Sequence, residues 1–390
     1  MPSPASGTEP PAGDPPGQGD GADANVNVTL PFAITRSAIE SARGPKVEVD
    51  PERPIAVFEE IEPVSPRASE TNVAEHRVAE PHRVAEPHVI EPQRAEVVSL
   101  ILAGAECSLR CTMCDLWRQT LDHATPAGAI PRQIAWGLSQ ITRRPGPARD
   151  AALRWVKLYN ASNFFDQRSV PREDWDDIAA LVRPFGRVIV ENHPRFVGDR
   201  VFDFAARLEG KLEVAIGLES ADDAILEILQ KRMTCRDFES AASRLRQHGV
   251  DVRAFVMLGP PGCPAERRLS LLLQTLRFAA EYGVRHVSVI PTRGGNGMME
   301  RLRDAGWFVP PGAGDLEEAM RESFGLGLPM VITADLWDWG NLQGHCEACR
   351  ELRLERLRRV NLGQRWFEID TADHGRGVGS GREGCECRLG

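Results

Sequence analysis

From residue 96 to about residue 306, short apolar segments alternate with segments of helical length. This alternation limits the possible folds more than any other feature of the sequence. The apolar, partly β-branched segments predicted as strands lie at 97–103, 153–159, 187–190, 212–216, 252–258 and 286–290. The helical patterns lie at about 132–142, 174–184, 199–209, 221–230, 236–248, 265–282 and 297–306. Strands that alternate with helices predict βαβ units and therefore a parallel sheet.

Six such units predict an α/β fold of the TIM type, a partial (β/α)6 barrel. A further apolar segment at 330–333 is a candidate seventh strand. A doubly wound open sheet is the alternative architecture. We place the barrel core at residues 96–310 and a small C-terminal extension, which contains cysteines, at residues 311–390.

The chain before the barrel is expected to contain little folded structure. Residues 1–30 hold six Pro and five Gly, and they are predicted to be disordered because they bury too little apolar surface. Residues 31–62 contain two apolar stretches and are expected to dock on the barrel. Residues 63–95 are predicted to be a low-complexity linker. Its short tandem repeat spaces three histidines evenly, which leaves metal binding as an alternative: His76, His82 and His88.

Charge and composition narrow the class of protein. The net charge of −9 argues against a protein wholly devoted to coating nucleic acid, although a local basic patch remains compatible with it. The first 30 residues lack Lys, Arg and an apolar run, so they are not a signal peptide. No segment approaches the ~18–20 apolar residues of a membrane-spanning helix. We expect a cytoplasmic protein without a membrane partner, whose nine cysteines are metal ligands, redox groups or buried thiols.

Cys107, Cys111 and Cys114 follow directly on the first predicted barrel strand, in the spacing Cys-x3-Cys-x2-Cys. This spacing arises by chance in about 0.5% of chains with this cysteine content, so it indicates a site. Three thiolates within eight residues can hold one face of a four-iron cluster and leave one iron open. A zinc site would need a fourth ligand, for which Asp115 is a poor candidate. A thioredoxin-like pair would leave Cys107 unused.

The motif, placed after the first strand, resembles that of the radical S-adenosylmethionine (SAM) superfamily. The resemblance implies that SAM binds the open iron of a 4Fe-4S cluster through its amine and carboxylate. An electron from reduced flavodoxin or ferredoxin then cleaves SAM to a 5′-deoxyadenosyl radical, which abstracts hydrogen from a substrate. Within the superfamily, three motifs most resemble the branch that contains the radical subunit of archaeosine synthase and, further off, the Elongator catalytic subunit. They are the Cys-Thr-Met-Cys run at 111–114, Gly-Leu-Glu-Ser at 217–220 and the Glu-x-x-Pro at 191–194.

The resemblance also implies the residues that contact SAM. After the second strand, Asn160 and Ser162 stand where the family often has Gly-Gly-Glu. After the fourth strand, Glu219 is expected to bind the ribose hydroxyls, with Ser220 beside it. Met113, within the cysteine motif, completes the expected contacts. Lys231 or Arg232 is a candidate partner of the SAM carboxylate; a solvated helix end is the alternative for both.

The substrate is less constrained than the cofactors. The named relatives act on transfer RNA, so a transfer-RNA nucleoside is the first candidate, with a small metabolite or a modified peptide as alternatives. His193, which follows the third strand, is a weak candidate for substrate contact and stands where relatives tend to have Arg. The glycine-rich segment 291–297 is expected to be a flexible loop, or else a loop that faces the substrate.

Two cysteine pairs in the C-terminal extension suggest a second metal site, with His345 as a replacement ligand and partly buried thiols as the alternative. These pairs are Cys346 with Cys349, and Cys385 with Cys387. The helical segment between them alternates arginines with leucines, which predicts either a solvated face or a stripe that faces RNA. Its arginines are Arg350, Arg353, Arg356, Arg358 and Arg359.

A second class of function also fits these residues. A non-catalytic iron–sulfur or zinc protein could use the same cysteines for electron transfer or as a scaffold. The two classes differ in one requirement, because only the enzyme needs a SAM pocket with Glu219 in it.

Overall fold

The structure is a computed structural model that describes residues 31–66, 92–141 and 151–367. The chain divides into two compact units between residues 33 and 34. The fold and the site both lie in the second unit. The segment predicted to be disordered, 1–30, lies outside the described residues, as does most of the predicted linker with its three histidines.

The second unit is built on one sheet whose strands follow one another in chain order. The strands are β1 (Ala56–Pro63), β2 (Arg94–Leu102), β3 (Arg154–Asn160), β4 (Arg187–Asn192), β5 (Lys211–Glu219), β6 (Asp251–Leu258), β7 (His286–Pro291) and β8 (Val331–Ala334). β1 pairs with β2 antiparallel, and all the later pairs are parallel. This order fits a barrel and excludes the doubly wound alternative, in which the strand order reverses within the sheet.

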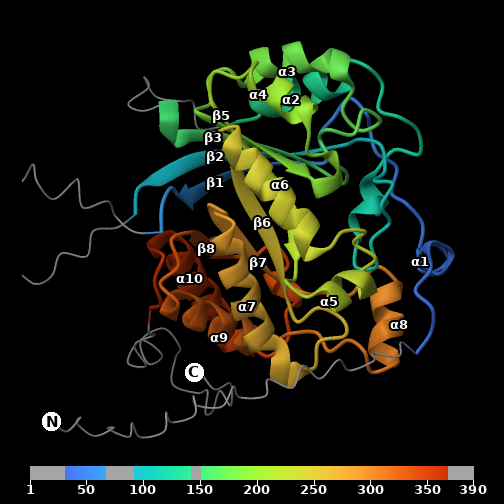
Figure 1. The fold of residues 1–390 in the computed structure, drawn as a ribbon, viewed down its shortest axis with the longest axis vertical. Helices are drawn as coiled ribbons and strands as arrows, with labels where there is room; N and C mark the ends of the chain where they lie inside the picture. The colour runs from blue at the N-terminus through green and yellow to red at the C-terminus, as the bar shows by residue number, and fades with distance from the viewer. Residues whose placement is uncertain (1–30, 67–91, 142–150, 368–390) are drawn as a thin grey trace, which may run out of the picture. The chain divides into compact units, whose positions relative to one another are not determined.

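Most of the helices connect the strands and cover the outside of the sheet. They are α1 (Arg36–Ala42), α2 (Ala129–Ser139), α3 (Trp175–Val182), α4 (Asp199–Ala205), α5 (Asp223–Ile228), α6 (Cys235–Gln247), α7 (Arg268–Glu281), α8 (Met298–Asp304), α9 (Ala313–Gly325) and α10 (Glu347–Gly363). Figure 1 shows α2, α3 and α4 grouped together, and α9 and α10 beside β8. Within the described segments, no helix has the length and apolar character needed to span a bilayer.

The predicted α/β barrel of the TIM type is confirmed, with two strands more than the six expected. β8 corresponds to the candidate seventh strand at 330–333. β1 lies almost wholly in the segment predicted to dock on the barrel, and it extends the sheet through backbone pairing with β2. The sequence did not predict this strand, because the alternation of apolar and polar residues is obscured. Both faces of β1 carry acidic side chains, among them Glu59, Glu60 and Glu62.

Strands β1 and β8 are the two ends of the strand order. Helix α10 packs against both of them. The seam between the first and last strands is therefore covered by the last helix that the structure describes.

The lumen of the barrel is filled at the amino ends of the parallel strands by five charged side chains, called here the floor network. They are Glu62, Lys157, Glu213, Arg253 and Arg285. The guanidinium of Arg253 donates to both carboxylate oxygens of Glu62, at 2.9 and 2.7 Å, and to Glu213 at 2.8 Å. Arg285 donates to both oxygens of Glu213, at 2.9 Å each, and Lys157 lies 2.6 Å from Glu62. These bonds join β1 to β6 across the lumen, so they hold the curled sheet together.

The outer face of the sheet is apolar and forms the main core under the helices. Its central side chains are fully buried, and they come from neighbouring strands: Leu100, Leu158, Val190, Val214 and Val256. The strands are thus apolar on the helix side and carry charge at the floor of the lumen, which leaves the carboxyl ends of the strands for the site.

Candidate cluster and cofactor site

The three motif cysteines lie in the loop that leaves the carboxyl end of β2, which is the end where barrels of this type carry their sites. Cys111 is buried, while Cys107 and Cys114 are half-buried. The Sγ of Cys107 accepts hydrogen bonds from the Leu109 N–H at 3.5 Å and from Asn163 Nδ2 at 3.4 Å. Donors to a cysteine sulfur are typical of iron–sulfur sites, where they tune the cluster.

Burial raises the pKa of the Cys111 thiol to about 11 and that of Cys114 to about 12. The other motif cysteines contribute to both raised pKa values, although less than burial does. The ammonium of Lys231 acts in the opposite direction on Cys107 and Cys111. Because metal ions bind thiolates, these thiols would release protons when they bind iron.

In the described part of the chain, no three His, Cys, Asp or Glu side chains converge on a point that would hold a single metal ion. A cuboidal cluster does not require such convergence, since each cysteine binds a different iron.

The cysteine loop is fastened to two distant parts of the chain. Thr112 donates from its backbone N–H to the Leu229 carbonyl and from its hydroxyl to the Ile228 carbonyl, both at 2.8 Å. The side-chain amide of Asn296 donates to the carbonyls of Thr112 at 2.6 Å and of Cys114 at 3.3 Å. The Asn296 oxygen in turn accepts from the Met299 N–H at the start of α8.

Asn296 is the functional residue that the sequence did not single out. Its segment was expected to be a flexible or substrate-facing loop, yet the amide fixes the cysteine loop instead. An Asn flanked by glycines directly before a helix is a weak signal of such a role, because Asn side chains readily bond backbone groups.

Glu219 and Lys231 form a buried ion pair of 2.6 Å next to the cysteine loop. Glu219 ends β5 at an irregularity in its pairing with β6, and its φ of 62° lies in the left-handed region. A Cβ atom at Gly217 would overlap both the Glu219 carboxylate and the Lys231 ammonium. Burial by itself lowers the pKa of Lys231, but the Glu219 carboxylate and the Cys111 sulfur raise it above its usual value.

Several polar side chains at the carboxyl ends of the strands are buried and have no hydrogen-bond partner among the described residues. We call them the mouth groups: Ser162, Asn192, Ser220 and Thr292. Buried polar groups are normally satisfied, so an unsatisfied set indicates a place for a ligand.

Two of the SAM contacts expected from the sequence, Ser162 and Ser220, are mouth groups. Asn160 is instead engaged within its own turn, where Nδ2 donates to Ser169 Oγ at 3.3 Å and Oδ1 accepts from the Ser162 N–H at 3.1 Å. Met113 is half-buried between Cys111 and Cys114. The contact of these residues with SAM stays a prediction.

His193 does not offer a ring nitrogen to a substrate. Its Nδ1 accepts from the Arg195 N–H at 3.1 Å, so Nε2 carries the proton and donates to the Lys231 carbonyl at 2.9 Å. Burial lowers the pKa of His193 to about 4, which keeps the ring neutral. The residue therefore ties the loop after β4 to the turn that carries Lys231, contrary to the expected substrate contact.

In the C-terminal extension, the Sγ atoms of Cys346 and Cys349 lie 3.5 Å apart. Cys385 and Cys387 lie outside the described residues, so the second metal site stays a prediction. The ring of His345 is stacked on Trp339.

The expectation that the arginines of α10 lie on one solvated or RNA-facing surface is wrong for two of them. Arg353 and Arg356 are buried, and both contact Glu317 of α9, at 3.0 and 2.6 Å. The carboxylate of Glu317 neutralises these two guanidinium groups inside the protein, although helical periodicity alone would place both arginines on the surface.

Comparison with known proteins gives two relatives in sequence, although no family model matches the chain. The chain is 24% identical over 287 residues to archaeosine synthase subunit beta of Methanosarcina acetivorans, covering 71% of this chain and 78% of that protein. It is 22% identical over 265 residues to an uncharacterized protein of Methanocaldococcus jannaschii, covering 65% and 72%. The resemblance to the archaeosine synthase branch that the motifs indicated is confirmed by the first of these relatives.

Among solved structures, the chain is similar to Elp3 of Methanocaldococcus infernus with an N-terminal deletion, at a TM-score of 0.43 and 14% identity. That match covers 60% of this chain and 59% of Elp3. It is also similar to methylornithine synthase, at a TM-score of 0.44 and 13% identity, covering 67% of this chain and 70% of that one.

Proposed function

We propose that this chain is a radical SAM enzyme that holds a 4Fe-4S cluster on Cys107, Cys111 and Cys114 and acts on a nucleoside in RNA. The observation that carries the proposal is a three-cysteine loop at the barrel mouth, beside the Glu219–Lys231 pair and the unsatisfied mouth groups. An electron-transfer protein or scaffold would not need the Glu219–Lys231 pair and the mouth groups next to its cysteines.

Each part of the site has a task that follows from its chemistry. Three cysteines leave one iron without a protein ligand. The ammonium of Lys231 suits the carboxylate of SAM, and the Glu219 carboxylate suits a ribose diol because it accepts two hydrogen bonds. When bound, the reduced cluster and SAM supply a 5′-deoxyadenosyl radical that removes a hydrogen atom from the substrate. Reduced flavodoxin or ferredoxin is the proposed source of the electron.

The substrate class rests on sequence similarity. The relative from Methanosarcina acetivorans is an archaeosine synthase subunit, and archaeosine is a nucleoside. A nucleoside in transfer RNA is therefore the first substrate to assay.

The proposal is tested by anaerobic reconstitution of the full chain with iron and sulfide. Dithionite and SAM are then added, and 5′-deoxyadenosine is measured by chromatography. We expect 5′-deoxyadenosine from the wild type, none from Cys111→Ala, and an unchanged yield from Cys263→Ala, a cysteine outside the motif. A stable cluster without SAM cleavage would favour the electron-transfer class, and bound zinc without a cluster would refute the proposal.

A further inference from the structure

A cavity of about 390 Å³ opens beside the site, between the loop that follows β4 and helix α6. Its size lies in the range of ligand pockets. Three guanidinium groups line it, those of Arg195, Arg232 and Arg244. We call it the arginine cavity.

The charges around the arginine cavity do not balance. Arg195 and Arg232 form no ion pair with a described carboxylate, and Arg232 only donates to the Leu109 carbonyl at 3.4 Å. Arg244 pairs with Asp199 at 2.8 Å, in an ion pair as exposed as those elsewhere on this surface. Two of the three guanidinium groups in the lining, those of Arg195 and Arg232, therefore have no carboxylate of their own.

The one carboxylate in the lining, that of Asp237, is already occupied. It accepts from the N–H and the hydroxyl of Thr234, at 2.8 and 2.9 Å, in the capping box of α6. These hydrogen bonds lower the pKa of Asp237, so it is ionised at neutral pH. Its single charge neutralises at most one of the two guanidinium groups that form no ion pair, so the cavity holds an excess of positive charge.

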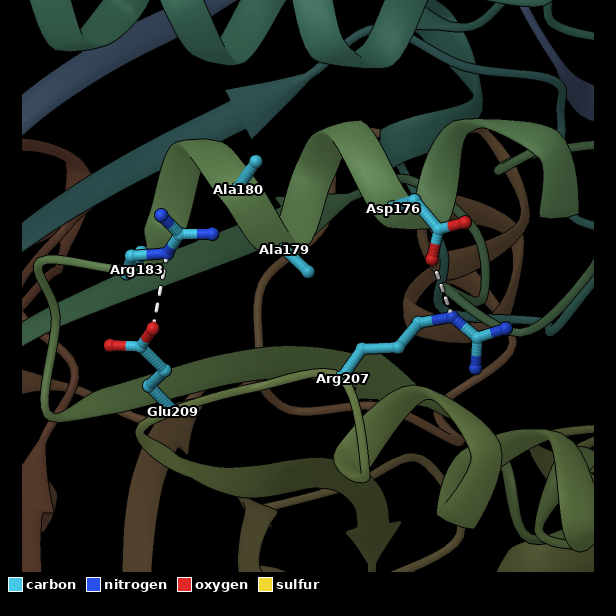
Figure 2. A pocket seen from close by; sticks show the side chains of 6 residues that line it. All are labelled: Asp176, Ala179, Ala180, Arg183, Arg207 and Glu209. Carbon is cyan, nitrogen blue, oxygen red and sulfur yellow. Dashed lines mark hydrogen bonds and ion pairs between the residues drawn. The ribbon is translucent and has the colours of Figure 1, made fainter.

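A second cavity shows that such an excess is not a general property of this surface. Figure 2 shows this cavity, of about 190 Å³, between α3 and the segment after α4. It also contains two arginines, but Arg207 lies 2.8 Å from Asp176 and Arg183 lies 3.1 Å from Glu209. We call it the paired cavity, since each guanidinium there has its own carboxylate.

The arginine cavity is connected to the cluster site through its rim. Arg232 contacts the cysteine loop at Leu109, and the preceding residue, Lys231, faces Glu219 and the cysteines. His193 lies in the lining and is neutral, because burial lowers its pKa. It holds the loop that carries Arg195 against the Lys231 turn without adding charge.

We propose that the arginine cavity binds a phosphate group of the substrate and so holds the substrate next to the barrel mouth. Arginine suits this ligand because its planar fork matches phosphate oxygens bidentately. The phosphate is either a diester in a polynucleotide or a monoester of a small substrate. The assignment rests on the proposed function, because the substrate's phosphate lies in this cavity only if the substrate reacts at the neighbouring cluster site.

The test compares two matched double variants of the full chain, Arg195→Ala/Arg244→Ala in the arginine cavity and Arg183→Ala/Arg207→Ala in the paired cavity. Both remove two exposed guanidinium groups, so their net charges are equal. Binding of a fluorescent single-stranded RNA is measured by anisotropy as a function of salt. We expect about tenfold weaker binding and a shallower salt dependence in the first variant only.

Competition identifies the source of the phosphate. If the site binds a phosphodiester chain, unlabelled RNA displaces the fluorescent probe. Inorganic phosphate and adenosine monophosphate then displace it only at far higher concentrations. Displacement by the monophosphate as efficient as that by RNA assigns the cavity to a small phosphorylated substrate.

Equal losses in the two variants would show that only overall charge matters, and they would overturn the proposal. Absence of binding of any phosphate probe by the folded wild type at low salt would overturn it as well. Thermal melting establishes that both variants fold. Because binding is measured without SAM turnover, failure of SAM cleavage would refute the proposed function and leave the binding result intact.

Discussion

Polar side chains are buried at both the floor and the mouth of the barrel, but the two ends differ in whether those side chains have hydrogen-bond partners. At the floor, Glu62 and Glu213 each accept from guanidinium groups, and Arg253 uses its whole fork on carboxylates. At the mouth, hydroxyl and amide groups are buried without partners among the described residues. The charged groups of the floor network are paired with one another, whereas the mouth groups are the unsatisfied set that the proposed function assigns to SAM.

The two ends also differ in how burial affects carboxylates. Burial by itself raises the pKa of Glu213, but the guanidinium groups of Arg285, Arg253 and Arg187 lower it well below its usual value. Glu191, nearer the mouth on β4, has only a backbone N–H donor at 2.9 Å and the more distant Lys231, so burial raises its pKa to about 8. The same residue type is therefore ionised at one end and protonated at the other.

The largest effect is expected from breaking the floor network. Arg253→Met leaves Glu62 and Glu213 short of their shared partner inside the lumen, and loss of one member of a buried pair costs about 3–5 kcal/mol. Denaturant unfolding measures this loss. Arg172→Met removes an exposed pair with Asp203 and is expected to cost less than about 1 kcal/mol. Similar costs for the two variants would show that the floor network does not stabilise the fold.

The opposite pKa directions predict opposite responses of stability to pH. The folded pKa of Glu213 is lowered, so its contribution is present above the unfolded value and is lost on acidification. The folded pKa of Glu191 is raised, so stability falls by up to about 1.4 kcal/mol per pH unit as pH rises from about 5 to 8. Glu191→Gln is expected to flatten that fall and to leave the acid limb intact. An unchanged pH profile would contradict the assigned protonation of Glu191.

A smaller effect is expected from crowding the Glu219–Lys231 pair. Gly217→Ala inserts a methyl group where both side chains lie, so SAM affinity of the reconstituted protein is expected to fall about tenfold, or about 1.4 kcal/mol. Titration calorimetry measures it. Gly314→Ala, with open space around the new Cβ, is the control. If both variants bind SAM like the wild type, the pair does not contribute to the cofactor site.

The smallest effect is expected from loosening the cysteine loop. Asn296→Ala removes the amide that bonds the Thr112 and Cys114 carbonyls, and the loss is confined to the loop. Iron release to a chelator is expected to become several-fold faster, while the melting temperature changes little. Asn341→Ala, which removes an exposed amide bonded to Asp338, is the comparison. Equal release rates would mean that Asn296 does not hold the loop.

Local patterns in the sequence predicted the barrel and the cysteine loop, because strand and helix periodicity and ligand spacing are properties of short segments. The contacts that complete the site join residues far apart in the chain. Asn296 and Thr112 are 184 residues apart, and neither segment alone indicates the other. The inward arginines of α10 were missed for the same reason, since their partner Glu317 lies on a different helix.

The position of α10 has a consequence for how the barrel is assembled. Because this helix packs on both β1 and β8 and follows both of them in the chain, it can cover the seam only after the two strands have been synthesised. Until α10 docks, the edges of β1 and β8 lack this cover, and unpaired strand edges are the features through which incomplete chains associate. The barrel is thus closed by a docking event between the first strand of the sheet and a helix that follows the last one.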